Sequence, residues 1–202
     1  MVEFLNKKNA VYLINHLFFA ILVVLIIELT KYILGVIEPE VNKLSEMYFS
    51  NFSLFVFQIV IFSPILEEIV FRLALKKNKY FWLSLLFSLL FLLTSNFVLV
   101  KIVMLLFILN IIIYQFSDRF IELYYSLIFF SILAFVAVHF DNYELKMFQT
   151  GNIRDMVILF LPQFFLSLIL TKIRIQTHLL NSILFHFVFN LIVMQLAILF
   201  DQ

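Results

Sequence analysis

The sequence contains no cysteine, which excludes a disulfide framework, a thiolate metal site and a cysteine nucleophile. Only 13% of the residues are charged and the formal net charge is +1, so the chain lacks the basic field that nucleic-acid binding requires. Two glycines and three prolines in 202 residues leave no linker-like stretch. We therefore expect a single domain spanning residues 1–202, with no nucleic-acid partner.

Hydrophobic residues are abundant instead. They make up 64% of the chain and give a mean hydropathy of +1.10, far above the values typical of soluble domains. The apolar runs are continuous, and most approach the roughly 20 residues needed to cross a bilayer. We predict an all-α polytopic transmembrane helical bundle in contact with the lipid bilayer, with about seven spans and a range of six to eight. The predicted spans lie near 11–36, 49–75, 80–99, 101–116, 121–140, 155–171 and 178–200, of which the fourth and sixth are short for a full crossing.

The lysine and arginine residues favour a cytoplasmic N-terminus, because cytoplasmic loops of membrane proteins carry an excess of these residues. With the N-terminus inside, nine of the fourteen fall on the cytoplasmic side: Lys7, Lys8, Arg72, Lys76, Lys77, Lys79, Arg119, Lys172 and Arg174. The five on the other side are Lys31, Lys43, Lys101, Lys146 and Arg154. We therefore expect a multi-pass protein of the cell membrane with its N-terminus in the cytoplasm.

The second predicted span contains three charged residues in the segment SPILEEIVFR, residues 63–72. A charged side chain near the bilayer centre costs about 2.5–3.5 kcal/mol on insertion scales. Glu68 and Arg72 are four residues apart on a helix and can form an ion pair that hides both charges. Glu67 projects about 100° away from Glu68, which makes it a candidate general base facing the bundle interior. The alternative is that all three residues form one structural salt-bridge cluster.

Two later spans carry a histidine at helical spacing from a second residue. Phe135 and His139 lie on one helical face, and so do His186 and Asn190. Each histidine alone is typical of a hydrogen-bonded core or interface residue. Together with Glu67, these residues supply the acid–base groups and hydrogen-bond donors that peptide hydrolysis requires.

The patterns EExxxR, FxxxH and HxxxN, in this order on successive membrane helices, resemble the motifs of the CPBP family, the CAAX proteases and bacteriocin-processing enzymes also called the Abi family. Here they are Glu67 to Arg72, Phe135 to His139 and His186 to Asn190, and Pro64 also fits the first motif. The resemblance covers about 58–193. It implies an intramembrane endopeptidase whose partner is a membrane-associated peptide or protein substrate, cleaved in CAAX-type processing or in the processing of peptide precursors.

The resemblance also implies roles for individual residues. Glu67 would take a proton from a water held between it and His139, and that water would attack the scissile carbonyl. His186 and Asn190 would donate hydrogen bonds to the developing oxyanion. Because water must reach a site at membrane depth, we expect a hydrated cavity open to the cytoplasm.

Glu68 and Arg72 would provide structural support for these groups. No cofactor is required on this interpretation. The family is often labelled as metalloproteases, so the alternative is a divalent metal such as zinc with a bound water. The metal ligands would then be Glu67, His139, His186 and Asn190.

The chain departs from the family pattern between its first two motifs. The motif-bearing core, at about 49–200, would contain an extra helix pair within about 80–116. An even number of added crossings leaves the motif helices on the same sides of the membrane. The rival interpretation is a non-enzymatic membrane protein, either a degenerate family member acting in immunity or scaffolding or a proton-coupled carrier.

Overall fold

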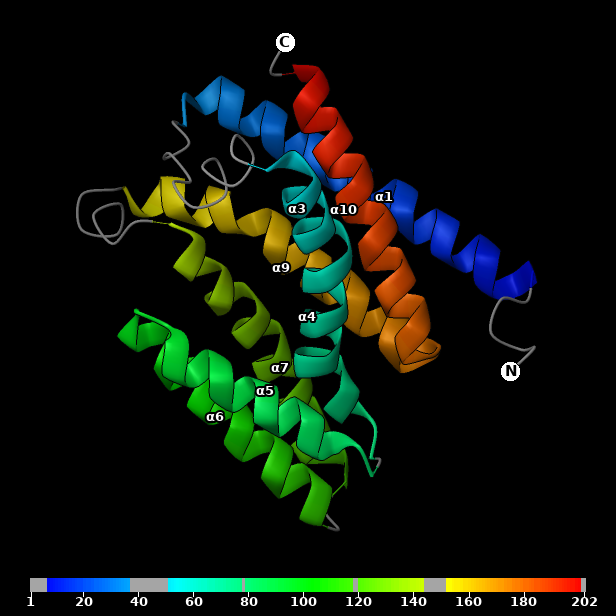
Figure 1. The fold of residues 1–202 in the computed structure, drawn as a ribbon, viewed down its shortest axis with the longest axis vertical. Coiled ribbons are helices and arrows are strands. Elements are labelled where there is room, and N and C mark those ends of the chain that lie inside the picture. Colours follow the sequence, from blue (N-terminus) through cyan, green and yellow to red (C-terminus); the bar gives the residue numbers. More distant parts are fainter. Residues whose placement is uncertain (1–6, 37–50, 78, 118–119, 144–151, 201–202) are drawn as a thin grey trace.

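A computed structural model describes residues 7–36, 51–77, 79–117, 120–143 and 152–200 of the chain (Figure 1). Over these ranges the chain is helical and has no β-strand. Six helices are long and apolar enough to cross a membrane, which confirms the predicted all-α polytopic bundle. The helices are α1 (Lys7–Leu34), α5 (Phe81–Thr94), α6 (Val98–Phe116), α7 (Phe120–Val138), α9 (Ile153–Gln176), α10 (Leu179–Phe200) and a composite helix, Phe52–Leu75.

The composite helix changes its winding along its length. It begins as α3 (Phe52–Val56), continues through the π-helical segment η1 (Phe57–Phe62) into α4 (Ser63–Arg72), and ends in the 3₁₀ turn η2 (Leu73–Leu75). A second 3₁₀ turn, η3 (His139–Asn142), extends α7. The turn η2 directly follows Arg72, and η3 begins with His139, so two of these three irregular segments adjoin or contain predicted site residues.

The lengths of the spans differ from those expected. The predicted span 80–99 contains α5, whose 14 residues reach roughly 21 Å at about 1.5 Å per residue. The runs that looked short, 101–116 and 155–171, belong to helices of 19 and 24 residues. The helix α9 continues past its apolar run because Arg174 is buried there, where its Nε donates to the backbone oxygen of Arg72 at 3.0 Å. Tertiary contacts therefore sustain a helical turn that hydropathy alone would end.

Three connections meet at one end of the bundle, which we call the basic end. Lys76 Nζ, after η2, donates to the backbone oxygen of Thr177 at 2.9 Å, between α9 and α10. Lys77 Nζ donates to the backbone oxygen of Ser117, after α6, at 2.8 Å. These lysines thus tie together the ends of three helices.

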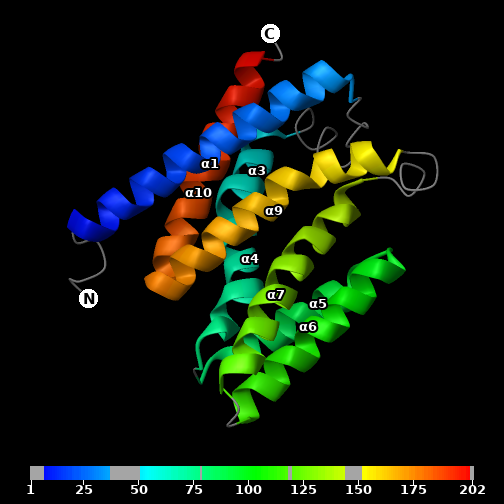
Figure 2. The ribbon, with the colours of Figure 1, turned by 180° about the vertical axis from the view of Figure 1, so that it is seen from behind.

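The opposite end contains the turn between α5 and α6 and the end of α7. There the backbone N–H of Asn96 donates to Oδ1 of Asp141 at 3.0 Å, and we call it the Asp141 end. Successive helices run alternately between the two ends, and the C-terminus lies toward the Asp141 end (Figures 1 and 2). Following this alternation back from the C-terminus, the N-terminus of α1 lies toward the basic end.

The helices α5 and α6 occupy the range of the predicted extra pair and lie side by side (Figures 1 and 2). α5 packs against α4, and α6 packs against α7. The Phe71 ring joins this pair to the motif helices, since its centroid is 5.9 Å from that of Phe107 in α6 and 5.6 Å from that of Phe135 in α7. The pair thus supports the motif helices from one side.

Candidate active site

A cavity of about 250 Å³ is lined by residues of α1, α4, η3, α9 and α10, together with Tyr143. All four residues predicted to be catalytic line it, although they come from three distant parts of the chain. Glu67 belongs to α4, His139 begins η3 after α7, and His186 and Asn190 belong to α10. Because the α5–α6 pair contributes no residue to the lining, the additional helices leave this cluster intact.

The π-helical segment and Pro64 explain how Asn190 is held. The N–H of Ser63 bonds to the backbone oxygen of Gln58, five residues back, as in a π-helix. In the same pattern the next donor, for the oxygen of Ile59, would be residue 64, but proline has no N–H. Asn190 Nδ2 instead donates to the Ile59 oxygen at 3.0 Å. One amide hydrogen of Asn190 is thereby engaged, and the second remains for the cavity.

The ion pair predicted from the spacing of Glu68 and Arg72 is present, with Nη1 and Oε1 3.5 Å apart. Both side chains are fully buried, so bulk water does not screen the pair. Arg72 Nη2 also donates to Oγ of Ser167 in α9 at 2.8 Å. These contacts fix α4 against α9 and leave Glu67 on a different face of α4.

His186 lies between the two glutamates. Its Nδ1 is 3.3 Å from Oε1 of Glu68, and its Nε2 is 3.7 Å from Oε2 of Glu67. Since an ionised carboxylate only accepts hydrogen bonds, Nδ1 carries a hydrogen toward Glu68. The separation of 3.7 Å is too long for a hydrogen bond. Oε2 of Glu67 is buried and has no hydrogen-bond partner among the described residues.

Phe135 and His139 act as a structural unit at the end of α7. Nδ1 of His139 donates to the backbone oxygen of Phe135 at 2.7 Å, which leaves Nε2 as an acceptor facing the cavity. The Phe135 ring centroid lies 4.8 Å from that of His139 and 6.0 Å from that of His186. The Arg72 guanidinium carbon sits 4.2 Å from the same ring centroid, in cation–π range. Phe135 therefore positions both histidines relative to the ion pair.

The first helix contributes cavity residues that the sequence reasoning missed. Glu28 and Lys31 of α1 line the cavity and form an ion pair at 2.7 Å. Lys31 is only 8% exposed, which is unusual for a lysine outside a site or ion pair. The signal in the sequence was a charged pair three residues apart inside an apolar run. Two further lining residues, Tyr143 and Gln163, carried no recognisable signal.

The arrangement does not fit the metal alternative as it stands. Among the described residues, no group of three His, Cys, Asp or Glu side chains is placed to hold a metal ion, and this includes the set Glu67, His139 and His186. We therefore derive no step through a metal. The alternative remains open to direct metal analysis of the purified protein.

Comparison of the chain with family models, with curated proteins and with solved structures gives no match. The functional conclusion therefore depends on the cavity, its residues and the motif resemblance.

Proposed function

We propose that the chain is an intramembrane endopeptidase of the CPBP type, which hydrolyses a peptide bond of a membrane-associated peptide or protein substrate. The observation that carries this proposal is the convergence of Glu67, His139, His186 and Asn190 on one cavity within the span region. Ionisable residues at membrane depth are costly and typically functional. A cavity that gathers a carboxylate, two imidazoles and an amide has the groups needed for general-base hydrolysis.

In the proposed mechanism, Glu67 acts as the general base. Nε2 of His139 accepts a hydrogen bond from the attacking water, since its Nδ1 is committed to the Phe135 backbone oxygen. Glu67 removes the other proton of that water as the water oxygen bonds to the scissile carbonyl carbon. The carboxylic acid then returns this proton to the amide nitrogen as the carbon–nitrogen bond breaks. The products are a new carboxyl terminus and a new amino terminus.

Asn190 and His186 stabilise the oxyanion in this mechanism. The free Nδ2 hydrogen of Asn190 is one donor. The second is His186, whose Nε2 lies 3.7 Å from Glu67 and is not held there by a hydrogen bond. Removing one such donor typically costs about 10²–10³ in kcat.

The contacts of Glu68 and Arg72 favour this assignment over a single structural cluster. Arg72 is paired with Glu68 and Ser167, and no ion pair joins it to Glu67 among the described residues. Oε2 of Glu67 has no hydrogen-bond partner among the described residues, but Oε2 of Glu68 and two nitrogens of Arg72 lack one as well, so this feature does not separate the two glutamates. What favours the enzyme hypothesis is that Glu67 lines the cavity, whereas Glu68 and Arg72 pair with each other outside its lining.

Terminus-labelling mass spectrometry of membranes tests the proposal. Cells would express the native chain, Glu67→Gln or the control Glu122→Gln, which makes the same change at an exposed position outside the cavity. We expect new peptide termini with the native chain and the control, and none with Glu67→Gln. Identical profiles from all three proteins, with equal melting temperatures, would contradict the proposal and favour a carrier or another non-enzymatic role.

A further inference from the structure

We infer that the cavity opens on the extracytoplasmic side of the membrane, so that its substrate is a peptide segment presented from outside the cytoplasm. That the cavity receives a substrate rests on the proposed function, whereas the direction in which the cavity opens rests on the geometry of the bundle. The relevant observations are the depth of the lining residues, the closure of the basic end and the distribution of basic residues.

The lining residues lie progressively closer to the Asp141 end. On α10, which starts at the basic end, the lining runs from His186 to Val193, about 10 Å farther along at 1.5 Å per residue. On α1 it consists of Val24, Glu28 and Lys31, all in the second half of the helix. On α9, which starts at the Asp141 end, it lies between Leu159 and Leu166, around the middle of the helix. His139 and Tyr143 lie at and beyond the end of α7. The cavity therefore extends from a floor at Glu67 and His186 toward the Asp141 end.

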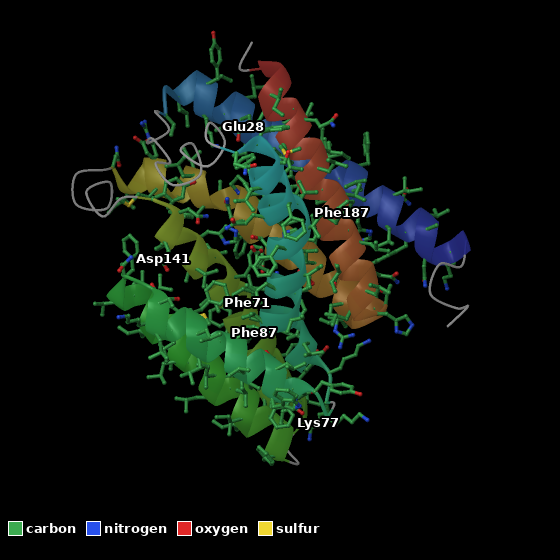
Figure 3. All side chains as sticks on the ribbon, viewed as in Figure 1. Glu28, Phe71, Lys77, Phe87, Asp141 and Phe187 are labelled. Atoms are coloured by element: carbon green, nitrogen blue, oxygen red, sulfur yellow. The ribbon has the colours of Figure 1, made fainter. Side chains whose placement is uncertain are left out.

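The opening includes the exposed side of the α1 ion pair. The Glu28 side chain is 50% exposed, whereas those of Lys31 and Glu67 are 10% and 14% exposed, so of these three charged lining residues Glu28 is the one that reaches the surface. Figure 3 shows Glu28 and Lys77 toward opposite ends of the bundle, with Asp141 far from Lys77. Glu28 thus marks the mouth.

The path from the floor to the basic end is closed by packed side chains. Ala74, Leu75 and Asn181 are 0% exposed and Arg174 is 8% exposed. Arg174 and Lys76 each donate a hydrogen bond to a backbone oxygen in this layer, at 3.0 and 2.9 Å. Access from the basic end would require these contacts to break.

The basic residues assign the two ends to the two sides of the membrane. Among the described residues, Lys8, Lys76, Lys77, Lys79, Lys172 and Arg174 lie toward the basic end. Lys31, Lys101 and Arg154 lie toward the Asp141 end. An excess of lysine and arginine marks the cytoplasmic side, so the Asp141 end is extracytoplasmic. The expected cytoplasmic N-terminus and the expected cytoplasmic mouth are therefore incompatible, because the structure places them at opposite ends.

The absence of cysteine allows a clean test with single-cysteine variants. Glu28→Cys reports the mouth, Asn96→Cys reports the Asp141 end at an exposed position, and Lys77→Cys and Lys79→Cys report the basic end. Spheroplasts of the expressing bacterium would be treated with a membrane-impermeant maleimide before or after permeabilisation. We expect labelling of the Glu28 and Asn96 variants in intact spheroplasts, and of the two lysine variants only after permeabilisation.

Two results would overturn the inference. Labelling of the lysine variants in intact spheroplasts would show that the basic end faces outward or that both orientations occur. Labelling of Glu28→Cys only after permeabilisation, like the lysine variants and unlike Asn96→Cys, would show that the mouth is not at the Asp141 end. Neither result depends on catalysis, so this test and the terminus-labelling test of the proposed function can fail independently.

Discussion

Replacing Arg72 by methionine removes the cation of a fully buried ion pair and leaves the fully buried Glu68 without it. Breaking a buried pair in this way costs about 3–5 kcal/mol, because the remaining charge is uncompensated. His186 stays beside Glu68 at 3.3 Å and compensates part of that charge, so we expect the lower half of the range, about 3–4 kcal/mol. At about 2–4 °C per kcal/mol for a chain of this size, the melting temperature in detergent falls by roughly 6–16 °C.

The comparison with Glu67 makes this prediction specific. Glu67→Gln removes a carboxylate whose buried oxygen makes no hydrogen bond with the described residues, so its melting temperature stays close to that of the native protein. The double variant Glu68→Gln/Arg72→Met recovers part of the loss, because no buried charge is then left alone. An Arg72→Met melting temperature equal to that of Glu67→Gln and of the control Glu122→Gln would refute the division of roles between Glu67 and the Glu68–Arg72 pair.

Four further predictions concern the site, its mouth and the basic end. Asn190→Leu lowers kcat by about 10²–10³, because it removes an oxyanion donor. Pro64→Ala gives the Ile59 oxygen a competing backbone donor, so it lowers kcat by a smaller factor without lowering the melting temperature. Equal initial rates for the native protein and Pro64→Ala would show that the π-helical segment does not position Asn190. Lys31→Met at the mouth raises KM by up to about tenfold, or about 1.4 kcal/mol, with little change in kcat. The assay uses a peptide substrate found by terminus mapping. A decrease in kcat with KM unchanged would show instead that Lys31 takes part in the chemical step. Burial lowers the pKa of Lys76, so the folded protein binds this proton less tightly than the unfolded chain, and stability rises with pH between the lowered pKa and the ordinary lysine value. In thermal melts across this alkaline pH range, Lys76→Met reduces the increase of stability with pH. An unchanged dependence of stability on pH would show that Lys76 is not its source.

The features predicted correctly from the sequence depend on local spacing and on apolar length. Continuous apolar runs suffice to predict a helical bundle, and the i, i+4 spacing of Glu68 and Arg72 suffices to predict their ion pair. The three motifs contain the four residues predicted to be catalytic, and all four line one cavity. The catalytic roles of these residues stay predictions.

The features that the sequence analysis missed depend on tertiary contacts. The last turns of α9 persist because Arg174 finds a backbone acceptor in α4, which no hydropathy window detects. The role of Pro64 becomes clear only when the winding of the preceding helix is known, because in a regular α-helix it would free a different carbonyl. The contribution of α1 depends on where that helix crosses α9 and α10. The direction of the mouth requires the relative depth of residues on five elements.

The central claim is that Glu67 activates water for peptide hydrolysis in the cavity. The most direct measurement uses purified native protein, Glu67→Gln and Glu122→Gln in vesicles, incubated in H₂¹⁸O with membranes from cells lacking the protein. The account predicts new carboxyl termini carrying ¹⁸O with the native and Glu122→Gln proteins and none with Glu67→Gln, because the attacking oxygen comes from water. Labelled termini at equal rates with folded Glu67→Gln, or their absence with all three proteins, would contradict it.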